Sequence, residues 1–247
     1  MIAHRFVPLI ASLCFASAAA AEPPTLIAEA ITNVMARAEP DKRWSFTRTQ
    51  TNGEGSFALR YDPSRTPESA WILLAPTEPE ALGGRLRGVL EDAQDEETAD
   101  LKAHRAPSEI LAPLADAFAQ GFGEDITIAS EDAERAVYVF EPILDDDDEL
   151  ADVREHLRQE LTVEKAERVV TAIRYVAIES FKPGPVARFN TMDLTMRFGE
   201  VEPGGPIALL EVDTQATGSA LFRRFDESWL ITNSDFARVE APEAATE

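Results

Sequence analysis

Two histidines and one run of carboxylates are the residues whose types could support chemistry in the main part of this chain. His104 and His156 both lie in charged segments with helical character, and neither has a second metal-binding side chain at ligand spacing. We interpret both as solvent-facing members of charged helices rather than as catalytic bases. The sequence has no H-E-x-x-H, G-x-S-x-G or phosphate-binding glycine loop, so no metal ion or cofactor is expected.

The acidic run from Asp145 to Glu149 could supply oxygen ligands for a calcium ion. An EF-type loop needs alternating ligands and a glycine at its sixth position, where this chain has Leu150. Acidic residues also favour the first turn of a helix, because they complement the positive end of its dipole. We prefer that interpretation and keep cation binding as the alternative.

Carboxylates elsewhere are too numerous to single out an acid/base pair. Cleavage of a glycoside needs two placed carboxylates and usually aromatic platforms, whereas Trp44, Trp71 and Trp229 are scattered over predicted strands. Packing in the core or at its rim explains these tryptophans as well. We therefore predict that the protein is not an enzyme, and an acid/base enzyme without a motif is the third alternative.

The charge of the chain restricts its partners. The sequence has 45 Asp plus Glu against 23 Lys plus Arg, a formal net charge of -22. Nucleic-acid binding is excluded on this ground because it depends on clustered basic residues, and the overall charge is a poor match for anionic lipid head groups. Hydrophobic residues make up 45% of the chain, enough for a sizeable folded core.

Residues 1–21 have the features of a cleaved signal peptide. His4 and Arg5 precede an apolar run, and small residues end at Ala21. Cys14 follows Leu13, which is too large for the usual lipoprotein acylation site, so lipidation is not expected. Cleavage would leave residues 22–247 as a single domain without cysteine. We predict a periplasmic location, with secretion beyond the cell as the alternative, and no transmembrane span in the mature chain.

The apolar periodicity of the first half predicts both helices and strands. A helix is expected at residues 25–38, and strands at 43–51, 55–61 and 70–74, the first two joined by Asn52 and Gly53 in a tight turn. Two helices within residues 78–123 should flank an acidic segment, 91–100. Strands at 126–129 and 136–140 and a short helix at 145–160 follow.

The second half contains four long strand candidates, at residues 168–181, 186–198, 207–222 and 228–239. Short connections rich in proline and glycine require antiparallel neighbours. In the second candidate Met192, Leu194, Met196 and Phe198 alternate with polar residues, which predicts one apolar and one polar face. Long strands curl, so we expect an α+β fold with a curved, half-barrel-like antiparallel sheet whose concave face is covered by helices.

The segment from Gly55 through Phe57 and Arg60 to Pro63, followed by Trp71 and Pro76, resembles the first hairpin of the periplasmic lipoprotein-carrier (LolA-like) family. The resemblance implies an antiparallel half-barrel with helices closing its concave side. It also implies that acyl chains bind there.

These observations together predict a periplasmic, non-enzymatic carrier of lipids or lipoproteins with an apolar cavity. The candidate lining comprises Leu26, Ile31 and Met35 on the first helix, and Phe57, Met192, Leu194, Met196 and Phe198 on the sheet. Ordinary packing of the first helix on the sheet explains the same apolar strip. The alternative function is a solid-core interaction module of the cell envelope that meets a basic envelope protein through acidic helices.

Overall fold

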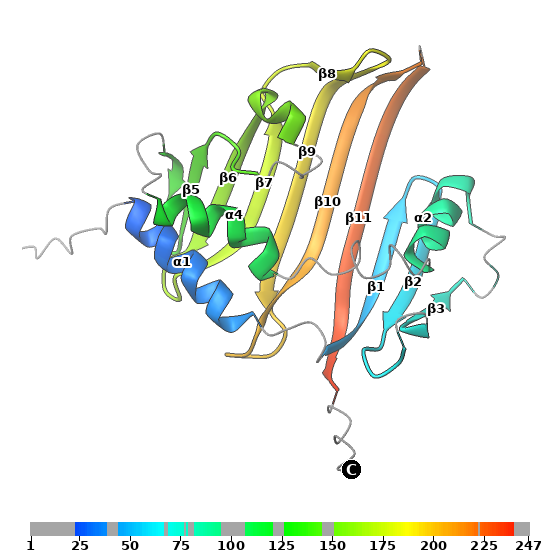
Figure 1. Cartoon of the computed structure of the whole chain (residues 1–247), viewed down its shortest axis with the longest axis horizontal. Coiled ribbons are helices and arrows are strands. Elements are labelled where there is room, and N and C mark those ends of the chain that lie inside the picture. The colour runs from blue at the N-terminus through cyan, green and yellow to red at the C-terminus, as the bar shows by residue number, and fades with distance from the viewer. Residues whose placement is uncertain are drawn as a thin grey trace, which may run out of the picture.

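The structure is a computed structural model that describes residues 23–38, 44–66, 69–76, 78, 82–94, 107–120, 126–144, 151–221 and 223–239. The predicted signal peptide with Cys14, His104 and the acidic run that starts at Asp145 lie outside these residues. Figure 1 shows the arrangement of the elements.

The described residues form three α-helices, one short 3-10 helix and a single sheet. The helices are α1 (Pro23–Arg37), α2 (Gly84–Gln94), α4 (Pro107–Ala119) and the 3-10 helix η4 (Ala151–His156). The strands are β1 (Trp44–Asn52), β2 (Gly55–Tyr61), β3 (Trp71–Ala75), β4 (Thr127–Glu131), β5 (Arg135–Phe140), β6 (Leu157–Glu164), β7 (Val169–Ala177), β8 (Phe181–Gly184), β9 (Ala187–Glu200), β10 (Ile207–Ala220) and β11 (Arg223–Arg238).

The sheet is antiparallel at every pairing, which confirms the predicted sheet type. Its order is β3-β2-β1-β11-β10-β9-β7-β6-β5-β4, with β8 paired to β9 alone. The order ends in two different strands, β3 and β4, so the sheet is not closed. The last strand, β11, lies in the middle of the sheet, where it joins the hairpins of the first half to the long strands of the second.

The predicted hairpin between β1 and β2 is present, but its turn differs from the prediction. Asn52 pairs with Gly55, so the turn is centred on Gly53 and Glu54, and the left-handed backbone conformation lies at Gly55, with φ 141°. The side-chain oxygen of Asn52 accepts a 2.8 Å hydrogen bond from the backbone N–H of Glu54. The asparagine therefore acts through its side chain rather than through a positive φ.

The predicted helix at residues 145–160 is wrong over its second part. Its described residues form the 3-10 helix η4 and then the first half of β6, whose burial alternates along the strand. Gln159 is fully buried inside β6, where it donates to Tyr175 Oη and accepts from the backbone N–H of Ile143. A polar side chain at a core position hides the period-2 pattern in the sequence.

The helices cover two ends of the same face of the sheet. α1 and α4 pack on β5, β6 and β7, around the fully buried Ile27, Leu111 and Ile173. α2 packs at the other end on β1, β2 and β3, around Leu86 and Phe57. Figure 1 shows the long strands β9, β10 and β11 passing between these two helical layers.

Candidate functional site

Rows of paired residues connect the two helix-covered cores across the middle strands. In antiparallel pairs, residues directly opposite each other point to the same face. One row runs from the buried Ile173 to the buried Phe57 through the four intervening residues Met196, Val212, Ile231 and Gln50. The next row on the same face lies two residues away along each strand and comprises Tyr175, Leu194, Thr214 and Trp229.

The middle of these rows forms an apolar strip that is only half-buried. We call it the central strip and define it as Leu194, Met196, Val212, Thr214, Trp229 and Ile231. The core side chains at either end of the rows are less than a tenth exposed, such as Ile173 at 0% and Phe57 at 1%. The helix-facing side of the sheet is therefore packed at its ends and more open at its centre.

The eight predicted lining residues fall in three hydrophobic clusters. Six belong to the cluster of α1 and α4, either within it or packed against it: Leu26, Ile31, Met35, Leu194, Met196 and Phe198. Met192 packs with Val153 and Phe181 near η4. Phe57 belongs to the cluster under α2. Pairing places Phe57 and Met196 in one row, so these two clusters are opposite ends of one face.

A hollow of about 420 Å³ lies at one end of the central strip. Its lining includes Trp229 and Phe225 of β11 and Arg85 in the first turn of α2. Arg85 donates a 2.5 Å hydrogen bond to Glu227 of β11, and its backbone N–H donates to Glu54. This ion pair ties α2 to the sheet beside the hollow, which we call the end hollow.

Arg48 places a positive charge on the same face, at the α2 side of the central strip. Its guanidinium lies 5.5 Å from the ring centroid of Trp71 and 5.9 Å from that of Phe46, and Nε donates to Asn233. Burial lowers the pKa of Arg48 to about 10, which leaves the group charged at neutral pH. The face is therefore apolar at its centre and carries a cation beside it.

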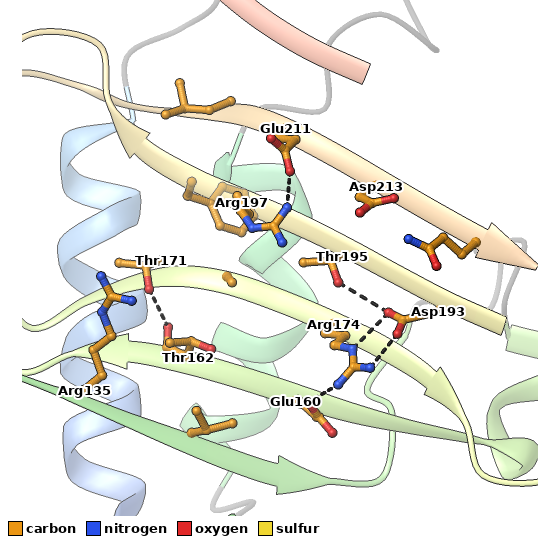
Figure 2. Close-up of a pocket in the computed structure, with 15 residues that line it drawn as sticks. Arg135, Glu160, Thr162, Thr171, Arg174, Asp193, Thr195, Arg197, Glu211 and Asp213 are labelled. Carbon is orange, nitrogen blue, oxygen red and sulfur yellow. Dashed lines mark hydrogen bonds and ion pairs between the residues drawn. The ribbon is translucent and has the colours of Figure 1, made fainter. Parts of the chain in front are cut away.

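The opposite face of the sheet carries a second hollow, of about 800 Å³, which we call the polar hollow (Figure 2). Its charged residues come from β5, β6, β7, β9 and β10. The basic ones are Arg135, Arg174 and Arg197, and the acidic ones are Glu160, Asp193, Glu211 and Asp213. Predicted alternation of β9 put Asp193, Thr195 and Arg197 on the polar face, and all three line this hollow.

Ion pairs organise the polar hollow. Arg174 donates to both oxygens of Asp193, at 2.9 and 2.5 Å, and to Glu160 at 3.0 Å, while Arg197 donates to Glu211. The hydrogen bond with Asp193 raises the pKa of Arg174, and the same bond lowers the pKa of Asp193. Since Arg174 and Asp193 are both over a third exposed, these pairs contribute modestly to stability.

Of the two histidines considered from the sequence, the structure describes His156 alone. His156, predicted on a solvent-facing charged helix, lies at the end of η4 with its side chain 28% exposed; its ring stacks on Phe181 at 5.4 Å and its Nδ1 lies 3.0 Å from Glu179. No group of three or more His, Cys, Asp or Glu able to hold a metal ion occurs in the part of the chain that the structure describes. None of the described helices is long and apolar enough to cross a membrane.

The residues that β10 and β11 contribute to the central strip are absent from the lining predicted from the sequence. Two long strands carry these residues at alternate positions: Val212 and Thr214 on β10, and Trp229 and Ile231 on β11. The sequence pattern was therefore sufficient to predict that each pair shares a face. The pairing of β11 with both β10 and β1 could not be predicted from the sequence, and this pairing brings Trp229 beside the α2 core.

Comparisons of the sequence with protein-family models, with curated proteins and with solved structures found no match.

Proposed function

We propose that the protein is a non-enzymatic periplasmic carrier that holds an acyl chain of a lipid or lipoprotein along the central strip. The observation that carries this proposal is the contrast in burial along the paired rows, packed at both ends and half-buried in the middle. We further propose that the sheet curves around the bound chain, with the helices on its concave side. The resemblance of residues 55–63 to the LolA-like carriers supports the same reading.

The chemistry of the central strip suits a flexible apolar guest. Each methylene of an acyl chain moved from water to an apolar surface contributes about 0.8 kcal/mol. Met196 supplies an adaptable thioether chain, and Trp229, which lines the end hollow, supplies a large apolar ring. A head group would then lie in the end hollow, beside Arg85.

The attachments of the helices suggest which wall moves. α1 is held by several polar contacts: Arg37 donates to Glu200 and to the carbonyl of Gly205, and Glu29 pairs with Arg168 at 2.7 Å. α2 is joined to β11 by the exposed Arg85–Glu227 pair, of the kind that contributes about 0–1 kcal/mol. We therefore assign the opening movement to α2 rather than to the first helix.

The test is native mass spectrometry of the protein exported to a bacterial periplasm, before and after organic extraction, combined with titration of a fluorescent fatty acid. A lipid-sized adduct that extraction removes is the expected result. Thr214→Trp should cover the central strip and reduce fatty-acid affinity at least tenfold. Gln215→Trp, on the next residue and the opposite face, is the matched control and should leave that affinity unchanged.

A protein with no adduct that also fails to bind phospholipid, acylated peptide and the fatty acid would refute the carrier proposal. Equal effects of the two tryptophan substitutions would also contradict it, because the ligand would then not distinguish the faces.

A second candidate is the envelope interaction module, and the polar hollow favours it. Its three arginines and four carboxylates could meet a partner segment that carries both charges, and Arg135 and Asp213 make no ion pair among the described residues. Cross-linking from residue 215 in living cells would capture such a partner. Loss of that capture in Gln215→Trp, with fatty-acid binding intact, would separate this function from the first.

A further inference from the structure

Two neighbouring strand connections form a basic region in a strongly acidic chain. Residues 181–192 and 214–225 contain no Asp or Glu, although the chain has 45 such residues. The same two segments carry Lys182, Arg188, Arg223 and Arg224. Both segments therefore have a positive local charge, although the whole chain has a net charge of -22.

Strand register brings these residues together at one end of the sheet. Ser219 of β10 pairs with Arg188 of β9 on one side and with Arg224 of β11 on the other. Ala220 likewise lies between Ala187 and Arg223. Figure 1 shows the β8–β9 and β10–β11 connections side by side at the end of the sheet, beyond α1, α2 and α4.

The positive charges of this region are not neutralised within the described residues. All four basic side chains are exposed, and none of them forms an ion pair with another described residue. Arg188 donates a 2.7 Å hydrogen bond to the neutral Ser180 hydroxyl. Asp226 is the nearest acidic residue along β11 and pairs with Thr217 in the sheet. Glu227, the next residue, is engaged by Arg85.

Two of the most exposed large apolar side chains of the described residues lie in the same place. Val186 is 58% exposed and Leu221 is 67% exposed, and the backbone N–H of Leu221 donates to the carbonyl of Val186. Leu221 has φ 47°, a left-handed conformation that leucine rarely adopts. Neither core packing nor backbone preference accounts for a leucine at this position.

We propose that this region, the basic tip (Lys182, Val186, Arg188, Leu221, Arg223 and Arg224), docks on a bilayer surface that contains anionic phospholipids. The basic side chains would contact phosphate groups while Leu221 and Val186 enter the interface. Overall charge does not prevent this, because charges further away than the Debye length of about 8 Å are largely screened. The end hollow begins at Arg224 and Phe225, so docking would bring it to the membrane. The inference depends on the tip alone and not on the proposed cargo.

Sedimentation with vesicles of phosphatidylglycerol and phosphatidylcholine, against vesicles of phosphatidylcholine alone, tests the proposal on the exported protein. Binding to the anionic vesicles that weakens with salt is expected. Each basic residue near such a surface is worth about fivefold in partitioning, so Arg223→Gln with Arg224→Gln should reduce binding about 25-fold. Leu221→Asn, whose side chain suits the left-handed backbone, should retain the fold and reduce binding about tenfold.

The control pair Arg65→Gln with Arg135→Gln makes the same change in net charge at the opposite end of the sheet, and should bind within twofold of the unmodified protein. Equal loss in both pairs, or no binding to anionic vesicles at 50 mM salt (~14 Å Debye length), would overturn the proposal. Binding to native membranes but not to protein-free vesicles would overturn it too, and would assign the tip to a protein partner. Urea midpoints of all variants establish that each is folded.

Discussion

Replacement of Val212 by threonine tests whether the central strip is a ligand-binding surface or part of an ordinary packed core. The change keeps the shape of the side chain and exchanges a methyl group for a hydroxyl. Val163, on β6, is fully buried in the α1–α4 cluster, whereas Val212, on β10, is half-buried. A hydroxyl without a partner in a dry core costs about 1–3 kcal/mol, and one that water reaches costs less than about 0.5 kcal/mol.

We therefore expect Val163→Thr to lower the free energy of unfolding by about 1–3 kcal/mol, and Val212→Thr by less than about 0.5 kcal/mol. Fatty-acid affinity should show the opposite pattern. Val212→Thr removes one apolar contact, so the dissociation constant should rise about fourfold, while Val163→Thr should leave it unchanged. Urea titration with a constant m-value and fluorescence titration measure the two quantities.

If Val212→Thr destabilises the protein as much as Val163→Thr and leaves fatty-acid affinity unchanged, the central strip is part of a packed core. That result would refute the carrier proposal, because half-burial of the central strip would then not mark a ligand-binding surface.

Three further predictions concern the sheet and the ion pairs beside these sites. Gly218→Ala would press a Cβ atom against the backbone oxygen of Arg188 on β9 and should lower the free energy of unfolding by about 1–3 kcal/mol. Gly184→Ala, with no atom within 4 Å of the new Cβ, should be nearly neutral by calorimetry. Because Arg174 lowers the pKa of Asp193, that carboxylate stabilises the fold above its unfolded pKa of about 3.9, and this contribution is lost as the pH falls through the lower folded value. Asp193→Asn should thus cost about 0.5–1 kcal/mol at pH 7 and nearly nothing at pH 2 in urea titrations; an equal cost at both would contradict the assignment. Glu227→Gln should release α2 and raise both binding and release rates of a fatty acid up to fivefold in stopped-flow measurements, with unchanged affinity; unaltered rates would exclude α2 as the moving wall.

Local patterns in the sequence were sufficient for most elements. The strand predicted at residues 55–61 coincides with β2, and the alternation of Met192, Leu194 and Met196 with Asp193 and Thr195 correctly separates the two faces of β9. Such patterns depend on neighbours within one element, where periodicity carries the information. The helices α1, α2 and α4 and the antiparallel sheet follow from them, whereas the helix predicted at residues 145–160 is η4 and the start of β6 over its described part.

Features that depend on distant residues could not be predicted in the same way. Trp44 pairs with Arg238, almost the full length of the described chain away, and no local period records that contact. The polar hollow needs side chains of five strands in register, which follows from pairing and not from composition. Gln159 is a polar residue at a core position of β6, where two hydrogen bonds satisfy its side chain. Its polarity interrupts the alternating apolar pattern by which the strand could have been predicted.

The central position of β11 also determines the order in which the sheet can be completed. β1 to β3 and β4 to β10 can each form hairpins from neighbours in sequence, but the two groups are joined only when β11 enters between β1 and β10. Contacts of such long sequence separation make folding slow, because the loop-closure entropy must be overcome before the pairing stabilises the chain. A ribosome-bound chain that lacks β11 therefore has two additional exposed strand edges, at β1 and β10, and an α2 core without Trp229 and Phe236. Exposed strand edges can pair with other chains and aggregate, so correct folding requires that these edges stay unpaired until β11 has been synthesised.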